Sequence, residues 1–255
     1  MINMKKLLAF DLDDTLAITK SPISDEMVKV LSKALELYDI CVISGGRFEQ
    51  FKLQITDRLA VSDKLLGHLH LMPTCGTQYY RYSDISHTWQ LQYSEDLSKE
   101  QKLRISQVLE TSAKQLGYWD QNPAGEVIED RGSQITFSAL GQQATAADKY
   151  AWDPEGSKKA TLRHLASLSL PDLEVRAGGT TSIDVTRRGI DKAYGMQKLI
   201  EATGTTKDEI LFFGDKLEEG GNDYPVKAMG IDTISVSKWE DTVEKLKEFI
   251  ANSRG

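Results

Sequence analysis

The stretch LLAFDLDDT, residues 7–15, joins a short apolar run to a cluster of carboxylates. A continuous apolar run of this length is typical of a strand that is buried on both faces of a parallel sheet. The carboxylates of Asp11, Asp13 and Asp14 follow so closely that they repel one another and need a counterion or raised pKa values. Magnesium, which carboxylates suit as ligands, would meet this need. The segment therefore predicts a ligand site beyond the carboxyl end of a strand, although a solvated acidic turn would look the same.

A second apolar strand that ends in an acid occurs near the other end of the chain. It reads LFFGD over residues 211–215, and GGND follows over residues 220–223. Carboxylates and flexible backbone at a second strand end could complete a metal site. Taken alone, this segment is also consistent with a glycine-rich surface turn. Two such strand ends in one α/β chain are hard to attribute to chance, so we interpret them as parts of one site.

Two further polar residues agree with this interpretation by their order along the chain. Ser44 follows the apolar run 40–43 and precedes Gly45 and Gly46, whose amides can open toward an anion at a helix N-terminus. Lys192 lies at the start of a predicted helix, where its ammonium would supply a point charge for a phosphate. Each has an ordinary alternative, because Ser44 could be a helix cap and Lys192 a solvated helix residue.

The pattern of strands and helices predicts an α/β fold that is interrupted by an insertion. Ser24 is a plausible N-cap for a helix with apolar residues at helical spacing. Short apolar runs alternate with helices in the first and last parts of the chain, whereas residues 84–185 contain half-buried alternating strands. We therefore predict a Rossmann-like parallel-sheet core formed by residues 1–83 and 186–255, with a second domain inserted at 84–185.

Length and composition limit the classes of protein to which the chain can belong. It has 255 residues, so we expect one large domain or two unequal ones. With 40% hydrophobic and 27% charged residues it has an ordinary globular composition, which argues against disorder. The net charge of −7 disfavours general binding to nucleic acid or to an anionic membrane, because both attract basic surfaces. An anionic substrate would therefore need local cations, amides or a metal ion.

The number of cysteines and the lengths of the apolar runs indicate the cellular compartment in which the protein works. The two cysteines, Cys41 and Cys75, are too few for a disulfide framework, and their spacing fits no zinc motif. The first apolar run ends at Asp11, which makes it too short for the core of a signal peptide. No stretch approaches the roughly 20 apolar residues that cross a bilayer. These features predict a cytoplasmic protein.

Together these segments resemble the motifs of the haloacid dehalogenase superfamily of phosphotransferases. Four motifs occur in the family's order: DLDDT at residues 11–15, then Ser44, then Lys192, then GD at 214–215 with ND at 222–223. The insertion between the second and third motifs resembles the α/β cap of subfamily IIB, which is called type C2B. The resemblance implies a Rossmann-like core with an inserted α/β cap that closes over the substrate.

A narrower resemblance, to the eukaryotic-type phosphomannomutases, rests on additional short segments. The similar segments are FFGDK at 212–216 with the following GGND, GG at 178–179 with SIDV at 182–185, and Asp191-Lys192. Residues 126–141 are weakly similar to that family's cap strand, with Arg131 in the place of one cap arginine.

The resemblance implies a catalytic role for the first motif. Asp11 would be the nucleophile that attacks phosphorus and forms an aspartyl-phosphate. Asp13 would be the general acid for the leaving alkoxide and then the base for the next acceptor. Lys192 would offset charge on the nucleophile and on the phosphate. The other phosphate-binding residues would be Thr15, Ser44 and Gly45.

The implied cofactor is Mg²⁺. Its ligands would be Asp11, the backbone carbonyl of Asp13, and Asp215. Asn222 and Asp223 would orient these ligands.

The cap would select the substrate, which the resemblance implies is a phosphorylated sugar. Ser182 and Asp184 match positions that contact sugar hydroxyls in the mutases, and Arg131 would hold a second anionic group. The Gly-Arg expected after the cap strand reads Gly141-Gln142 here, and the arginine expected before that strand is missing. Each lost charged contact to phosphate weakens binding by about 1.5–3 kcal/mol.

A mutase has to retain a bisphosphorylated sugar, so this depleted cap favours a different reaction. We expect a phosphatase that hydrolyses a phosphorylated sugar or a similar small metabolite, with a mutase that interconverts hexose 1- and 6-phosphates as the alternative. A catalytically dead binding protein would be expected to have lost Asp11, Asp13 or Asp215, and all three are present. We expect no nucleic-acid or membrane partner, and a monomer or a cap-mediated homodimer. Arg47, at a helix start, could face the substrate or the solvent.

Overall fold

The chain divides into two compact units in the computed structural model, which describes residues 5–252 apart from the side chain of Ala146. The core unit combines the chain up to Ser94 with the part that begins at Asp191. The cap unit is Glu95–Ile190. One domain therefore interrupts another, with junctions at 94/95 and 190/191 where the sequence suggested 83/84 and 185/186.

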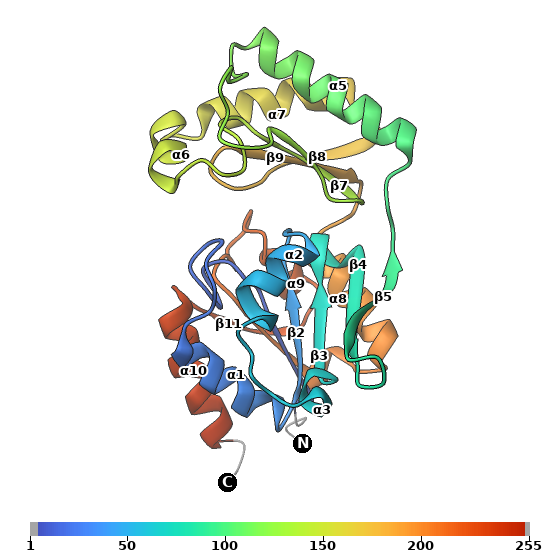
Figure 1. Ribbon diagram of the computed structural model, residues 1–255, viewed down its shortest axis with the longest axis vertical. Helices are drawn as coiled ribbons and strands as arrows, with labels where there is room; N and C mark the ends of the chain where they lie inside the picture. Colours follow the sequence, from blue (N-terminus) through green and yellow to red (C-terminus); the bar gives the residue numbers. More distant parts are fainter. Residues whose placement is uncertain (1–4, 253–255) are drawn as a thin grey trace. The chain divides into compact units, whose positions relative to one another are not determined.

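A seven-stranded sheet lies at the centre of the core unit (Figure 1). Its parallel part consists, in spatial order, of β11 (Asp232–Ser235), β10 (Ile210–Gly214), β1 (Leu7–Phe10), β2 (Asp39–Ile43) and β3 (Leu69–Met72). The strand order shows that β1 lies between β10 and β2. Because the carboxyl ends of parallel strands meet at one edge of a sheet, the loops that follow these three strands are neighbours.

An antiparallel hairpin, β4 (Gln78–Ser83) and β5 (Thr88–Ser94), extends the sheet beyond β3. The sequence suggested that the insertion begins at residue 84, inside this hairpin. The backbone of β4 pairs with β3, so the hairpin continues the core sheet and the junction lies after it. Alternation of aromatic and polar residues does not reveal which sheet a strand joins, because the partner is chosen by tertiary pairing.

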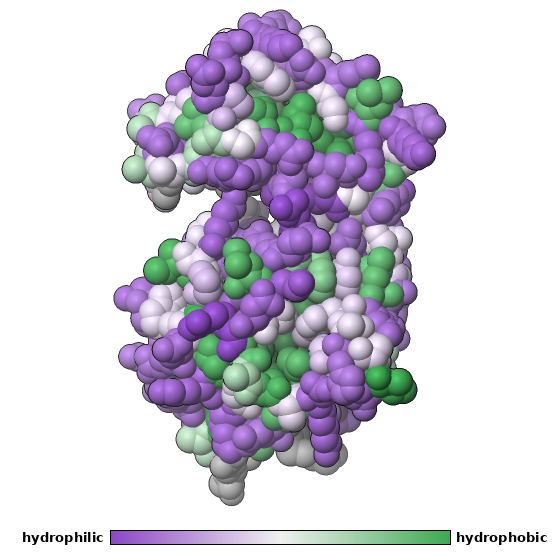
Figure 2. Space-filling model, viewed as in Figure 1, coloured by the Kyte–Doolittle hydropathy of each residue, from purple (hydrophilic) through white to green (hydrophobic). Residues whose placement is uncertain are grey.

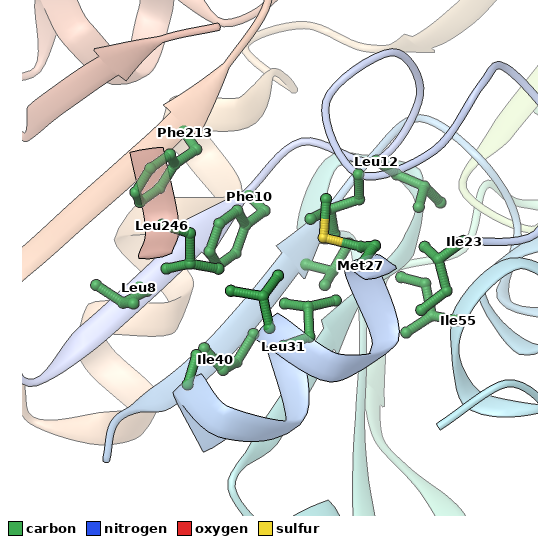
Figure 3. Packing of buried hydrophobic residues seen from close by; sticks show 14 of the residues in the cluster. Leu8, Phe10, Leu12, Ile23, Met27, Leu31, Ile40, Ile55, Phe213 and Leu246 are labelled. Carbon is green, nitrogen blue, oxygen red and sulfur yellow. The ribbon is translucent and has the colours of Figure 1, made fainter. Parts of the chain in front are cut away.

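On one face of the parallel strands, the side chains of Leu8 and Phe10 pack against helices. These residues belong to one apolar cluster with residues of α1 (Asp25–Leu35) and α10 (Trp239–Asn252), as Figure 3 shows. The two helices also contact each other. Ser24 caps α1 by accepting a hydrogen bond from the amide of Met27 at 3.1 Å, which confirms the predicted N-cap.

The opposite face of the sheet is covered by other helices. Leu7 and Ala9 belong to a second apolar cluster with residues of α8 (Lys192–Thr203) and α9 (Tyr224–Ala228). Side chains of a strand alternate between its two faces, so the continuous apolar run at 7–10 covers both. The expected parallel sheet with helices on both faces is therefore confirmed.

The remaining elements of the core unit are short. After β2 the chain forms α2 (Phe48–Phe51) and, directly after it, a π-helical turn, η1 (Lys52–Thr56). The other short elements are α3 (Asp63–Leu66), α4 (Pro73–Gly76) and η2 (Lys207–Glu209). Within α4 the backbone is left-handed, with φ of 49° at Thr74 and 56° at Cys75.

The cap unit contains a four-stranded antiparallel sheet in the order β6-β7-β9-β8. Apolar residues of β7 and β9, including Phe137 and Ile183, pack with the long helices α5 and α7 in one cluster. The alternate residues of these strands are polar and lie on the other face. The elements are α5 (Lys99–Gln115), β6 (Ile128–Asp130), β7 (Gln134–Ser138), α6 (Ala146–Trp152), α7 (Ser157–Ser169), β8 (Leu173–Ala177) and β9 (Ser182–Arg187).

The surface seen in Figure 2 is mainly hydrophilic, with apolar residues in small groups. Among residues 5–252, no helix combines the length and the apolar character that a membrane span requires.

Candidate active site

The register between β1 and β10 brings the two acidic strand ends together. Phe10 lies opposite Phe213, and their rings stack with centroids 4.8 Å apart. The amide of Asp11 donates to the carbonyl of Phe213 at 3.0 Å. Asp11 therefore leaves its strand beside Gly214 and Asp215, within the core unit.

Lys192 lies between two carboxylates of this site. Its Nζ is 2.5 Å from Oδ1 of Asp11 and 2.5 Å from Oδ1 of Asp223. None of the three side chains is more than 5% exposed. Lys192 is the first residue of α8, and the N-cap Asp191 accepts a hydrogen bond from the amide of Tyr194 at 3.0 Å. The capped helix start thus delivers one buried ammonium to two buried carboxylates.

Close packing of α8 against the turn after β3 permits this approach. A Cβ on Gly195 would lie 2.4 Å from Cδ1 of Ile43 and 2.6 Å from the carbonyl oxygen of Cys75. A Cβ on Gly76 would lie 2.4 Å from the Cα of Gly195. Neither position has room for a side chain, so two glycines let the start of α8 reach the carboxyl ends of the strands.

Burial and neighbouring charges shift the pKa values of Asp11 and Lys192. Burial raises the pKa of Asp11 to about 7, even though the positive charge of Lys192 acts to lower it, and Asp223 raises it further. Burial opposes the charge of Lys192, but the carboxylates of Asp11 and Asp223 outweigh it and raise the pKa of the lysine. The lysine therefore keeps its charge, while Asp11 exchanges a proton near neutral pH.

Asp223 has both of its carboxylate oxygens engaged. Oδ1 accepts a hydrogen bond from Lys192, and Oδ2 accepts one from the amide of Lys216 at 3.1 Å. A Cβ on Gly214 would lie 2.5 Å from Oδ2 of Asp223, so this glycine leaves the space that the carboxylate occupies. Asp223 therefore holds both Lys192 and the loop after β10.

Three carboxylates of the core unit lie close enough to share a cation. One oxygen from each of Asp11, Asp215 and Asp223 lies within 4.8 Å of the others. Oδ2 of Asp215 accepts from Nζ of Lys216 at 2.7 Å, but its Oδ1 is buried and has no hydrogen-bond partner. A cation would satisfy this oxygen, and an all-oxygen donor set fits magnesium. Asn222, in the same loop, is exposed.

The carboxylate of Asp13 contacts a different set of groups. Nε2 of Gln50 donates to its Oδ2 at 3.2 Å, and Nε2 of Gln54 donates to its Oδ1 at 3.2 Å. The amide of Lys20 donates to Oδ1 at 2.9 Å. The side chain of Asp13 thus has its hydrogen-bond partners outside the cluster of Asp11, Asp215 and Asp223.

Asp14 also has separate partners. Its carboxylate accepts hydrogen bonds from Oγ1 of Thr19 at 3.0 and 3.1 Å and from the amide of Thr19 at 3.3 Å. The three carboxylates of this loop therefore have three different sets of partners.

The expected phosphate-binding residues lie at the ends of β1 and β2. Thr15 is fully buried, and its Oγ1 has no hydrogen-bond partner. Oγ of Ser44 accepts from the amide of Gly46 at 3.3 Å. A Cβ on Gly45 would meet no atom within 4 Å, which shows that the space beside this residue is open. Arg47 is half-exposed, with Nε 3.7 Å from Oε2 of Glu49.

The substrate residues expected in the cap unit lie on or beside the polar face of its sheet. Asp184 on β9 accepts from Oγ1 of Thr136 on β7 at 2.7 Å. Burial raises the pKa of Asp184, while the charge of Arg131 and neighbouring hydrogen bonds lower it in part. Nε of Arg131 donates to Oε2 of the buried Glu129 at 2.8 Å. Ser182 lies two residues before Asp184 and so points to the same face.

The motifs did not reveal Gln50 and Gln54. A signal was present, because Gln54 stands between the apolar residues Phe51 and Ile55, where an amphipathic helix would place another core residue. An amide at a core position needs a polar partner, and Asp13 is that partner.

The fold and the arrangement of this site define the class of protein. A haloacid dehalogenase-like hydrolase from Bacteroides thetaiotaomicron superposes with a TM-score of 0.66 at 16% identity, over 96% of this chain and 99% of that one. The chain thus has the haloacid dehalogenase fold with an inserted cap, as the motifs predicted.

A family model described as eukaryotic phosphomannomutase matches residues 27–252, and the chain belongs to this family. The phosphomannomutase of Saccharomyces cerevisiae is 28% identical over 257 residues, which cover 95% of this chain and 93% of the yeast protein. A probable phosphomannomutase of Caenorhabditis elegans is 27% identical over 235 residues, which cover 88% and 87% of the two chains. The resemblance stated from the motifs is therefore confirmed.

Proposed function

We propose that this protein is a magnesium-dependent phosphatase that hydrolyses a phosphorylated sugar, or a similar small metabolite, through an aspartyl-phosphate on Asp11. The observation that supports this most strongly is the buried contact of 2.5 Å between Nζ of Lys192 and Oδ1 of Asp11. The contact fixes one oxygen of the carboxylate and leaves the other for attack on phosphorus.

The first half of the reaction transfers the phosphoryl group to the protein. An oxygen of Asp11 forms a bond to phosphorus as the bond from phosphorus to the sugar oxygen breaks. Asp13 gives its proton to that departing oxygen, so the sugar leaves as an alcohol. Lys192 offsets the charge that gathers on the phosphoryl group, and Oγ1 of Thr15 and the Ser44-Gly45 segment hold its oxygens.

The second half releases phosphate. Asp13, now a carboxylate, takes a proton from water as the water oxygen attacks the phosphorus of the aspartyl-phosphate. The bond from phosphorus to the oxygen of Asp11 breaks at the same time, which releases phosphate and restores the Asp11 carboxylate. A bound magnesium ion would supply positive charge that offsets the negative charge of the carboxylate and of the phosphoryl group. Asp11, Asp215 and the backbone carbonyl of Asp13 would hold it, with Asn222 and Asp223 orienting these groups.

The charges of the cap unit support hydrolysis over mutase chemistry. Arg131 already pairs with the buried Glu129, and Gln142 offers an amide where a second cationic side chain was expected. A mutase has to hold a second phosphate strongly, which arginines do by bidentate contacts. We propose that Ser182 and Asp184 recognise sugar hydroxyls and that Arg131 is the one cap cation for a distal anion.

Phosphomannomutase is the second candidate, and the match to that family over residues 27–252 favours it. The test is a screen of hexose 1- and 6-phosphates with Mg²⁺ that follows phosphate release and isomerisation together, with and without hexose bisphosphate. The phosphatase proposal expects phosphate release to exceed isomerisation under both conditions. Isomerisation that outpaces release when bisphosphate is present would assign the mutase reaction instead.

The same screen on the Asp11→Asn variant tests whether this protein is an enzyme that uses Asp11 or a binding protein on the same fold. This variant should retain the fold and lose both activities, because the amide is a poor nucleophile. Unchanged turnover in Asp11→Asn, measured alongside its circular dichroism spectrum, would exclude Asp11 as the phosphorylated residue.

A further inference from the structure

The carboxylate of Asp13 accepts hydrogen bonds from side chains that lie outside the motifs. Gln54 donates to its Oδ1 at 3.2 Å, Gln50 donates to its Oδ2 at 3.2 Å, and the Lys20 amide donates to Oδ1 at 2.9 Å. Each carboxylate oxygen thus has a side-chain amide donor, and both of these donors come from the segment that follows the Ser44 loop.

The orientation of the Gln54 amide is determined by its two acceptors. Its Nε2 donates both to Asp13 and to the carbonyl of Ser21, at 2.9 Å from the latter. A flipped amide would place Oε1 against two acceptors, which would repel it. Gln54 is fully buried, and its Oε1 has no hydrogen-bond partner. Because packing alone does not favour an unsatisfied buried amide, the contact with Asp13 accounts best for its presence.

The local backbone brings both glutamines to the same carboxylate. They are four residues apart, so they lie on one side of the helical segment. The segment includes the π-helical turn η1, in which the amide of Asp57 donates to the carbonyl of Lys52 at 3.0 Å. A Cβ on Gly46 would lie 2.5 Å from Oε1 of Gln50, so the glycine of the neighbouring loop leaves room for this side chain.

We propose that Gln54, assisted by Gln50, is a positioning residue that holds Asp13 in one orientation for proton transfer. The inference rests on the proposed function, in which Asp13 protonates the departing sugar oxygen. Proton transfer demands hydrogen-bond geometry between donor and acceptor, so a carboxylate that can rotate freely would transfer its proton less often. The glutamines therefore act on the proton-transfer step and not on the attack by Asp11.

Two substrates whose leaving groups differ in their need for a proton can distinguish proton transfer by Asp13 from attack by Asp11. A sugar alkoxide must be protonated as it leaves, whereas p-nitrophenolate is stable without a proton. The experiment measures the single-turnover rate of phosphorylation of Asp11 by p-nitrophenyl phosphate and by the sugar phosphate that the substrate screen identifies. The variants are Gln54→Leu, Gln50→Leu and, as the reference, Asp13→Asn.

We expect Asp13→Asn to slow phosphorylation by the sugar phosphate far more than phosphorylation by p-nitrophenyl phosphate. Gln54→Leu should show the same selectivity with a smaller loss, roughly tenfold for the sugar phosphate, because general acid catalysis contributes about 10²–10⁴-fold in total. Gln197→Leu is the matched control, since Gln197 is exposed on α8 and its Nε2 donates to Oε1 of Glu201 at 3.1 Å. It should leave both rates unchanged.

Equal losses with both substrates in Gln54→Leu, or no loss with either, would overturn the inference while Asp13 keeps its role. Equal losses in Asp13→Asn would instead remove the proposed role of Asp13, and the inference with it. If Gln54→Leu does not fold, Gln50→Leu decides, because Gln50 is partly exposed and its replacement leaves no buried group unsatisfied.

Discussion

The carboxylate of Asp223 occupies the space directly beside Gly214, where a side chain at position 214 would stand. The distance from a Cβ at this position to Oδ2 of Asp223 would be 2.5 Å, and to Cε1 of Phe212 it would be 2.8 Å. The strand end that carries Asp215 and the loop that carries Asp223 can therefore meet only because residue 214 is glycine.

Gly214→Ala should displace Asp223, release Lys192 from its anchor and lower turnover at least tenfold. Overpacking of this kind typically destabilises by about 1–3 kcal/mol. Gly179→Ala is the control for stability, because a Cβ there would meet only Oγ of Ser182 at 3.9 Å. Urea unfolding of both variants and phosphate release by Gly214→Ala test this, and a Gly214→Ala protein with wild-type turnover would contradict it.

Lys192→Met should destabilise the protein by roughly 3–5 kcal/mol, because it leaves two buried carboxylates without their counterion. Activity should be lost as well. Lys216→Met offers a contrast, since its partner is Asp215 but its own side chain is half-exposed and a solvated pair contributes about 1 kcal/mol or less. Denaturant unfolding at pH 8 without magnesium compares the two. Equal losses of stability would show that burial does not set the strength of the Lys192 contacts.

Magnesium affinity should rise with pH and level off above about pH 7. Burial raises the pKa of Asp11 to about 7, so below that pH the group carries a proton that the cation has to displace. Each pH unit below this value should weaken binding up to about tenfold, since one proton competes with one ion. Titration calorimetry between pH 5.5 and 8.5 measures this dependence. Asp11→Asn should bind more weakly at high pH and show little dependence on pH in this range.

Asp14→Gly should be more stable than Asp14→Ala by about 1 kcal/mol, which is the reverse of the usual order. Asp14 has a φ of 64°, a left-handed conformation that glycine adopts freely and alanine does not. Both variants lose the hydrogen bonds from Thr19, so their difference isolates the backbone. Asp57, which is exposed and has a φ of −70°, is the matched position, and there alanine should be the more stable replacement.

The parallel core could be predicted from the sequence because its signals are local. The apolar run before Asp11 is the observed β1, and the run before Asp215 is the observed β10. Strands buried on both faces have to be continuously apolar, and an acid that ends such a run marks the carboxyl end of the strand. The location of the candidate site could be predicted as well, because parallel strands end at the same edge of a sheet and their terminal acids lie close together there.

The remainder depends on contacts between distant segments. The assignment of residues 84–94 to the core sheet depends on the pairing of β4 with β3, which no local pattern encodes. The ion pair of Arg131 with Glu129 and the hydrogen bond from Gln54 to Asp13 depend on side-chain geometry. Amides and carboxylates are as common on surfaces as in sites, so composition and spacing alone do not separate the two.

The attachment of Lys192 to Asp223 as well as to Asp11 gives the proposed reaction a stationary positive charge. When Asp11 is phosphorylated its carboxylate becomes an acyl phosphate, and the negative charge moves from the carboxylate oxygens to the phosphoryl group. Asp223 takes no part in bond making, so the ammonium keeps its place through both half-reactions. A positive charge that does not have to be rebuilt between steps requires no reorganisation when the second transition state forms.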